Sequence, residues 1–131
     1  MQDPHRFPVT VYYEDTDMAG IVYYANYLRY IERSRSEIVE EMGLDQNAMR
    51  ADGVVFAITR VEADYIASAR LGDRLTVETT HGPKGAVRWM FDQKVLRGEQ
   101  LIFRALVTAV CMTTEGKPAR LPAEVRALKS A

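Results

Sequence analysis

Three carboxylates within four positions near the N-terminus are the first sign of chemistry in this sequence. Glu14, Asp15 and Asp17 are followed by residues 18–22, which are small or apolar. An ordinary turn needs one Asp, because one side chain can close it by bonding its own backbone. A reactive acid beside an apolar loop would present the same pattern. Spacing alone leaves two interpretations open, a surface turn before a helix or a pocket with a catalytic carboxylate.

Other residue types that support catalysis are sparse. His5 and His81 are far apart in sequence, and neither belongs to a Ser-His-Asp set or a Cys/His cluster. A mechanism that uses a carboxylate therefore needs fewer assumptions than one that uses a Ser-His-Asp set. We also expect no metal site. Cys111 lies inside an apolar run, which favours a buried thiol over a nucleophile.

Length, composition and net charge restrict the class of protein to which this chain can belong. The chain has 131 residues, of which 47% are hydrophobic, so we expect one domain spanning residues 1–131 with a real core. The net charge of −1 offers no basic field for nucleic acid. Residues 1–8 contain no apolar segment, and no apolar run approaches the length of a membrane span. We therefore expect a cytoplasmic protein without membrane insertion.

The acidic stretch is expected to join a strand to a long helix. Residues 7–13 alternate apolar and polar side chains, which predicts a strand. Residues 25–42 carry an apolar stripe at helical spacing, and Gly43 is a natural stop for that helix. Asp45 can cap a short second helix through residue 51.

The remainder of the chain reads as β-structure. Turn signals at residues 72–73, 82–85 and 97–99 separate strands expected at 54–67, 74–81, 86–96 and 101–112, before a short helix at 122–128. The order is one strand, one long helix and four strands in a meander. One helix cannot flank both faces of so much sheet, so we predict an α+β fold in which an antiparallel sheet curls around it.

The stretch from Tyr13 to Tyr27 resembles the signature of the 4-hydroxybenzoyl-CoA thioesterase-like acyl-CoA thioesterases. The element order resembles the hotdog fold, in which a curved antiparallel sheet of about five strands wraps around one long central helix. Asp64, Tyr65 and residues 69–73 are most similar to the branch of bacterial thioesterases associated with the Tol-Pal system. The resemblance covers nearly the whole chain.

The resemblance implies roles for particular residues. The family's catalytic carboxylate matches Asp17, and the backbone N–H that polarises its thioester carbonyl matches Tyr24. Asn26 and Tyr27 belong to the same motif and are expected to shape the site. The Tol-Pal branch often carries histidine where this chain has Tyr24, and the 4-hydroxybenzoyl branch carries tyrosine there, so the substrate class is left open.

Elementary chemistry agrees with this assignment. Thioester hydrolysis builds negative charge on the carbonyl oxygen, and a helix N-terminus offers unpaired N–H groups and a positive dipole end. A carboxylate opposite can attack the carbonyl or activate a water molecule. Asp17 precedes Tyr24 by seven residues, across a loop that Gly20 makes flexible.

The expected contacts with substrate extend beyond this pair. The candidate substrate-binding residues are Gly20, Val22, Tyr23, Asn26, Tyr27, Lys84 and Arg88. Tyr23 and Tyr24 line an acyl pocket in one interpretation and are core aromatics in the other. Lys84 and Arg88 either meet the phosphates of coenzyme A or are solvated surface charges, with Arg60 and Arg70 as weaker candidates.

The leading hypothesis is an acyl-CoA thioesterase that releases a free acid and coenzyme A, which is part of the substrate, so no cofactor is expected. The alternative is a non-catalytic partner of acyl carrier protein or of a lipid-synthesis enzyme. A dehydratase on the same fold is weaker, because it needs an Asp/His pair near the helix. Residues 54–58 would form a bare apolar edge in a monomer, so we predict a homodimer or homotetramer.

Overall fold

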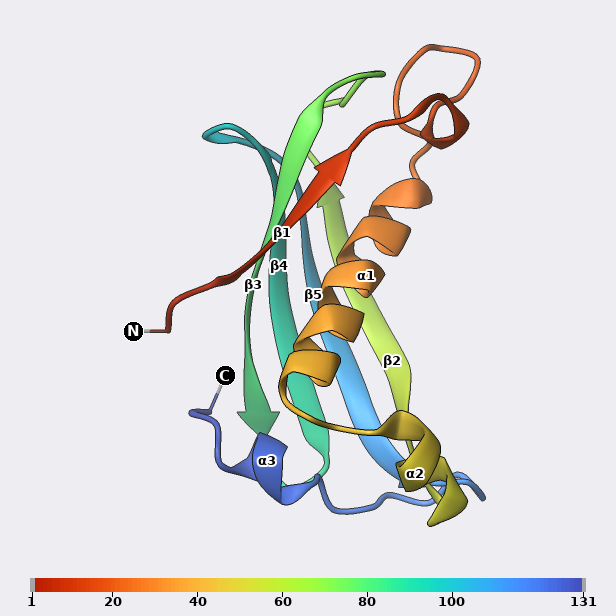
Figure 1. The fold of residues 1–131 in the computed structure, drawn as a ribbon, viewed down its shortest axis with the longest axis vertical. Helices are drawn as coiled ribbons and strands as arrows, with labels where there is room; N and C mark the ends of the chain where they lie inside the picture. Colours follow the sequence, from red (N-terminus) through yellow and green to blue (C-terminus); the bar gives the residue numbers. More distant parts are fainter. Residues whose placement is uncertain (1, 131) are drawn as a thin grey trace.

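The computed structural model describes residues 2–130 as a five-stranded antiparallel sheet with one long helix across its face (Figure 1). The strands are β1 (His5–Thr10), β2 (Val54–Tyr65), β3 (Arg74–Lys84), β4 (Arg88–Arg97) and β5 (Gln100–Thr113). The helices are the 3-10 turn η1 (Tyr13–Asp15), α1 (Asn26–Glu41), α2 (Gln46–Ala51) and α3 (Ala123–Arg126). The predicted α+β architecture, an antiparallel sheet curled around a helix, is confirmed. No helix in the described part of the chain is long and apolar enough to cross a membrane.

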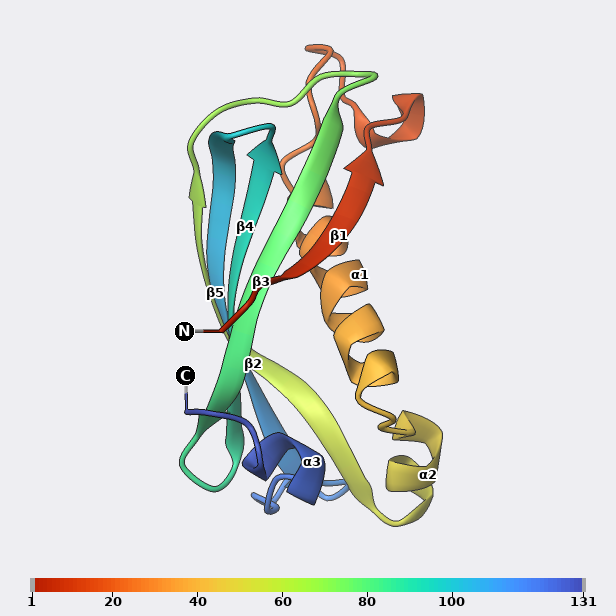
Figure 2. The ribbon, with the colours of Figure 1, turned by 60° about the vertical axis from the view of Figure 1, so that its left-hand side comes forward.

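The strand order is β1-β3-β4-β5-β2, which corrects the predicted four-strand meander. Strands β3, β4 and β5 do follow one another as hairpins, but β2 pairs with β5 and not with β3. Helices α1 and α2 carry the chain across the sheet face to its far edge, where β2 begins (Figure 1). The segment after β2 then crosses the end of the sheet to reach β3 (Figure 2). Strand β2 is therefore an edge strand, and no strand of residues 2–130 pairs with its outer side.

Two predicted boundaries are wrong for identifiable reasons. The first strand ends at Thr10, three residues before the predicted end, because the chain turns into η1. The predicted turn at residues 82–85 is instead strand up to Lys84, and the chain reverses after it. Strand β1 pairs with β3 only as far as Thr79, so Pro83 lies where its missing N–H opposes no β1 neighbour.

Helix α1 has the predicted extent and is flanked by Ala25 and Met42. Gly43 ends it with φ +76°, a conformation that costs glycine little. Asp45 caps α2 as predicted, by accepting the N–H groups of Asn47 and Ala48. The buried face of α1 packs on the concave side of the sheet; its members are Asn26, Tyr27, Tyr30, Ile31, Ser34, Ile38 and Val39.

A polar seam lies in the middle of this packing. The Gln93 side-chain amide donates to the Ile31 carbonyl at 3.0 Å and to Thr79 Oγ1 at 3.0 Å. Ser34 Oγ lies 3.2 Å from Thr79 Oγ1. Ser34, Thr79 and Gln93 are all fully buried, so these bonds satisfy groups that water does not reach. The seam ties α1 to β3 and β4. Trp89 and Phe91 also belong to the buried core, and Cys111 is buried as predicted.

Strand β2 contains a β-bulge between Ile58 and Arg60, where its register with β5 shifts. Before the bulge, Phe56 and Ile58 oppose Cys111 and Ala109, which face α1. After it, Val61, Ala63 and Tyr65 oppose residues of β5 that also belong to the buried face. The extra residue keeps both halves of β2 aimed at the helix. We call these five residues the β2 strip; they are Phe56, Ile58, Val61, Ala63 and Tyr65.

Candidate active site

The acidic stretch folds into a tight loop that leaves one carboxylate open to solvent. The Asp17 N–H donates to the Ile21 carbonyl at 2.9 Å, and the Gly20 N–H donates to the Asp17 carbonyl at 3.0 Å. Gly20 adopts φ +78°, which the turn requires. Asp17 Oδ1 accepts the Ala19 N–H at 2.9 Å. Asp17 Oδ2 accepts no hydrogen bond from the described residues, so that oxygen is available to a ligand or a water molecule.

Asp15 has the opposite environment, although it lies only two residues away. Its side chain is 5% exposed and accepts the Tyr12 N–H at 2.9 Å through Oδ2. Its Oδ1 accepts the Asn26 side-chain amide at 2.9 Å. Asp15 therefore joins η1 to the first residue of α1, which gives it a structural role.

The start of α1 presents unpaired backbone donors. The Asn26 N–H donates to the Tyr23 carbonyl at 2.8 Å, and the Tyr23 N–H donates to the Asp15 carbonyl at 2.8 Å. The N–H groups of Tyr24 and Ala25 have no acceptor within residues 2–130. Unpaired N–H groups at a helix N-terminus favour negative charge nearby. The structure thus has the donors that an oxyanion needs, a few residues after the open carboxylate.

Aromatic side chains surround this helix end. The Tyr24 ring lies 5.0 Å from Tyr23 and 6.1 Å from Tyr65, centroid to centroid. The Tyr65 hydroxyl donates to the Tyr24 carbonyl at 3.1 Å, which holds the peptide after Tyr24 in place. Burial raises the pKa of Tyr65, so its phenol remains a donor at neutral pH. Tyr24 is 62% exposed, so its ring lies at the surface of this chain and outside the core.

The predicted substrate-binding residues of the loop divide into two groups. Gly20 and Tyr23 lie at the surface beside Asp17 and Tyr24. Val22, Asn26 and Tyr27 are buried, so their side chains hold the loop and helix end. Within this second group, the Tyr27 hydroxyl accepts the Ala69 N–H at 3.1 Å, and the Tyr27 ring stacks on Phe103.

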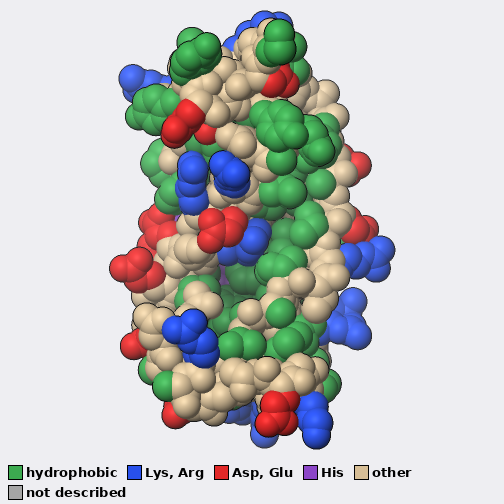
Figure 3. Space-filling model, turned by 90° about the vertical axis from the view of Figure 1, so that its right-hand side faces the viewer, with side chains coloured by type: hydrophobic (Ala, Val, Ile, Leu, Met, Phe, Trp, Pro, Cys, Tyr) green, Lys and Arg blue, Asp and Glu red, His purple; other side chains and the backbone are tan. Residues whose placement is uncertain are grey.

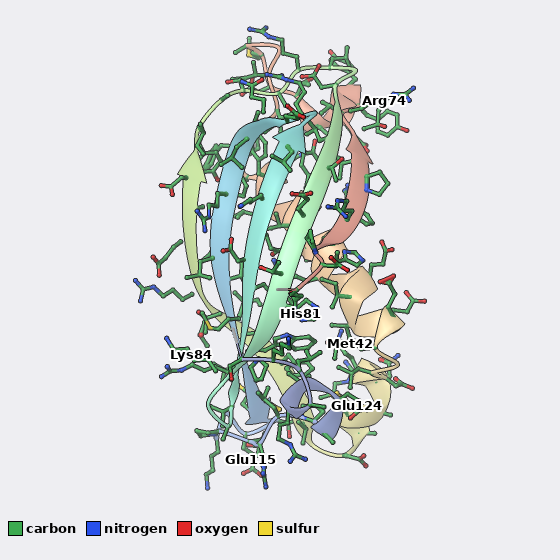
Figure 4. The ribbon with its side chains drawn as sticks, turned by 90° about the vertical axis from the view of Figure 1, so that its left-hand side faces the viewer. Met42, Arg74, His81, Lys84, Glu115 and Glu124 are labelled. Carbon is green, nitrogen blue, oxygen red and sulfur yellow. The ribbon has the colours of Figure 1, made fainter. Side chains whose placement is uncertain are left out.

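Lys84 and Arg88 lie far from this loop within one chain. They face each other across the β3–β4 hairpin, at the end of the sheet opposite the acidic loop. Figure 4 shows Lys84 at one end of β3 and Arg74 at the other, beside the loop end. Both candidate cations are exposed. Arg70 is closer, since it forms a backbone bridge with Ile21.

Neither histidine joins the acidic loop. His81 Nδ1 accepts the Trp89 indole N–H at 3.1 Å, and the His81 ring stacks on Phe91. Burial lowers the pKa of His81, in agreement with a neutral ring that accepts this bond. His81 therefore has a packing role near the Lys84 end of β3.

Comparison with known proteins identifies the family. The sequence pattern of the thioesterase-like superfamily matches residues 11–128. The chain belongs to this superfamily. Acyl-CoA thioester hydrolase YbgC of Escherichia coli is 36% identical over 122 residues, covering 92% of this chain and 91% of the relative. Acyl-CoA thioesterase YbgC of Haemophilus influenzae is 35% identical over 123 residues, covering 92% and 90%.

Solved structures of the superfamily share the fold. A 1,4-dihydroxy-2-naphthoyl-CoA thioesterase from Synechocystis matches with a TM-score of 0.86 at 29% identity, covering 92% of this chain and 91% of that chain. A probable thioesterase from Bartonella henselae matches with a TM-score of 0.80 at 32% identity, covering 92% and 100%. The predicted hotdog fold and the predicted thioesterase family are both confirmed.

Tyr65 was not among the residues that the sequence predicted for the site. Its hydroxyl bonds the Tyr24 carbonyl, so it contacts the backbone that presents the free donors. The available signal was the break in alternation within β2, which turns Tyr65 toward the helix. That break is visible in sequence, but its meaning depends on pairing with β5.

We predict that Asp15→Asn lowers the stability of the fold more than it affects chemistry. The Asn side chain has one acceptor oxygen where Asp15 uses two, so a buried donor loses its partner, at a cost of about 1–3 kcal/mol. Urea unfolding followed by circular dichroism measures this change. Glu14→Gln is the matched control, since Glu14 is exposed and should shift stability by less than about 0.5 kcal/mol. An unchanged unfolding midpoint in Asp15→Asn would contradict the role of Asp15.

Proposed function

We propose that this protein hydrolyses acyl-CoA thioesters to a free carboxylic acid and coenzyme A, with Asp17 and the Tyr24 N–H as the reacting groups. The observation that carries the proposal is the pairing of an open carboxylate with unpaired helix N-terminal donors. The free Asp17 Oδ2 and the free Tyr24 N–H flank one surface loop. Membership of the thioesterase-like superfamily supports the same reaction.

The chemistry follows from what each group can do. The Tyr24 N–H donates to the thioester carbonyl oxygen, and its bond strengthens as that oxygen gains negative charge. In one route, Asp17 attacks the carbonyl carbon and expels the CoA thiolate, and water then hydrolyses the mixed anhydride. In the other, Asp17 takes a proton from water, the hydroxide attacks, and the thiolate leaves. Both routes consume one water molecule and release one acid and one CoA thiol.

A second copy of the chain completes the proposed site. Strand β2 is an unpaired edge of twelve residues, and exposed apolar side chains gather beside it and at the acidic loop (Figure 3). Exposed edges with apolar neighbours favour association. Antiparallel pairing of two β2 edges would join the sheets and cover these side chains. We therefore propose a homodimer as the minimal active unit, with a homotetramer as a further assembly.

Such a dimer would also explain Lys84 and Arg88. A twofold axis through β2 exchanges the two ends of the sheet, so one copy's β3–β4 hairpin moves to the end that carries the other copy's Asp17. In this arrangement Lys84 and Arg88 serve the phosphates of a CoA bound at the opposite copy. Coenzyme A is then part of the substrate, and the reaction uses no separate cofactor. The Tol-Pal association is what the resemblance implies, whereas a cytoplasmic location and acyl carrier protein as a partner are expectations from the sequence.

We expect Asp17→Asn to lose at least about a hundredfold in kcat, because Asn neither takes a proton nor attacks a thioester. The measurement is thiol release from a panel of acyl-CoA substrates. Tyr24→Phe is the control: it keeps the backbone N–H and should retain substantial activity. Hydrolysis at the parent rate by Asp17→Asn would show that the loop is not the active site. A parent protein inert toward the whole panel would favour the non-catalytic partner hypothesis instead.

Heavy-oxygen water distinguishes the two roles of Asp17. If Asp17 is the nucleophile and water opens the anhydride at the Asp17 carbonyl carbon, repeated turnover leaves label in the Asp17 side chain. If Asp17 is a general base, all label appears in the acid product. Mass spectrometry of the peptide that contains Asp17 reads the outcome.

Light scattering at micromolar concentration should give the mass of a dimer or tetramer. Ile58→Asp should shift the protein toward monomer, since this side chain is 47% exposed beside the β2 edge. Leu106→Asp is the matched control, because Leu106 is 39% exposed on the opposite face of the sheet. A parent protein that stays monomeric would rule out the proposed dimer.

Replacing both Lys84 and Arg88 by Ala should raise KM for acyl-CoA and leave kcat nearly unchanged. Phosphate contacts are equally strong in the ground state and the transition state, so they act on binding alone. The effect should shrink as salt is added, because these cations are exposed. Should KM stay the same, the phosphates bind elsewhere, and Arg70→Ala is the next variant to measure.

A further inference from the structure

A cavity of about 180 Å³ lies between α1 and β2, on the side of α2, whose Gln46 also lines it. Its wall is mostly apolar and includes Phe56, Ile58, Trp89 and Phe91. Arg35 is the one cation that lines it among the described residues. Figure 3 shows this hollow with hydrophobic side chains inside it and charged side chains at its rim.

Arg35 occupies an unusual position for a cation. It follows Ile31 by four residues and precedes Ile38 by three, so it lies within the apolar stripe of α1. Its Nη1 donates to Gln93 Oε1 at 2.9 Å, and Gln93 is itself held in the buried seam. The guanidinium is thus fixed in orientation by a side chain on β4.

Arg35 lines the cavity as a cation without an ion-pair partner in the described part of the chain. No carboxylate of the described residues forms an ion pair with it. Glu32 lines the same cavity, but its Oε1 accepts the Ser36 hydroxyl at 2.8 Å. Burial lowers the pKa of Arg35, and Glu32 only partly opposes this. Nε and Nη2 of Arg35 have no acceptor within residues 2–130, so one edge of the guanidinium is free.

An apolar track connects this cavity to the proposed reaction centre. The β2 strip runs from Tyr65, which bonds the Tyr24 carbonyl, to Phe56 and Ile58 in the cavity wall. Along α1, nine residues separate Asn26 from Arg35, which is about 14 Å at 1.5 Å per residue. A long side chain on a helix leans back toward the N-terminus, which shortens the separation by roughly one turn. An acyl chain of medium length therefore spans the track.

We propose that the acyl group of the substrate lies along the β2 strip and ends in a carboxylate, which Arg35 binds in the cavity. This inference rests on the proposed thioesterase function, because the thioester must lie at Tyr24. The free edge of a guanidinium matches a carboxylate with two parallel hydrogen bonds. A half-buried cation without a partner is costly, and an anionic ligand removes that cost. The β2 strip between Tyr24 and Arg35 is apolar, so it favours a methylene chain between the thioester and the terminal carboxylate of the substrate.

Paired substrates of equal chain length test this assignment. Sebacoyl-CoA carries a terminal carboxylate, whereas decanoyl-CoA ends in a methyl group. The parent protein should show a higher kcat/KM for sebacoyl-CoA, by about tenfold or more, as expected for hydrogen bonds to a charged group. Arg35→Met should remove this preference through KM, and Arg35→Lys should keep part of it. A parent protein that prefers decanoyl-CoA would overturn the proposal, whether or not the variants fold.

A matched variant separates recognition from stability. Arg29 lies on the same helix and is exposed, so Arg29→Met should leave the preference unchanged. Thermal unfolding of each variant reports whether the fold survives. If Arg35→Met stays folded and lowers kcat/KM equally for both substrates, Arg35 has a structural role and the proposal fails.

Binding of free sebacate separates this inference from the proposed reaction. Calorimetry on the parent protein should show binding that Arg35→Met abolishes and Arg29→Met preserves. If the parent hydrolyses no thioester yet binds sebacate through Arg35, the proposed function fails and the carboxylate site stands. If it hydrolyses thioesters but binds no sebacate and shows no preference, the carboxylate site fails and the proposed function stands.

Discussion

One helix covers one face of a sheet that is wider than the helix, and much of the structure follows from this mismatch. An α-helix with its side chains is about 10 Å wide. Five strands at about 4.8 Å spacing extend across roughly 19 Å. Curling brings β1 and β3 around one side of α1, but β2 remains apart on the other side (Figure 2). The cavity lined by Arg35 and the partly exposed β2 strip both result from that uncovered margin.

The acidic loop shows how environment assigns different tasks to identical side chains. Asp15 is enclosed by two donors and holds the start of α1, so both its oxygens are occupied. Asp17 has one oxygen bound to the backbone and one open. Because Asp15 accepts hydrogen bonds from both η1 and Asn26, it holds the first turn of α1, next to which the Tyr24 N–H lies, fixed relative to the acidic loop. Preorganised donors of this kind need no rearrangement when charge develops.

Local features of the sequence predicted local structure well. The apolar spacing of α1, its stop at Gly43 and the cap at Asp45 act within a few residues, so they appear in the structure as expected. The pairing of β2 with β5 was missed because no nearby residue specifies which strand a distant edge will join. Arg35 was visible within an apolar stripe, but its unpaired charge depends on Gln93, which lies 58 positions away. The catalytic assignment of Asp17 came from resemblance, since spacing alone did not distinguish it from Asp15.

The bulge in β2 lies close to the midpoint of the strand, between Ile58 and Arg60 of Val54–Tyr65. A bulge interrupts the ladder and increases the local twist, so any strand that pairs along this edge must shift its register there, as β5 does on the other side of β2. In the proposed dimer, a second copy turned about the midpoint of β2 would present its own bulge at the same place. In the proposed dimer, the bulge would therefore favour an identical partner over an unrelated strand. Removing it would straighten the edge and widen the set of foreign strands able to join the sheet.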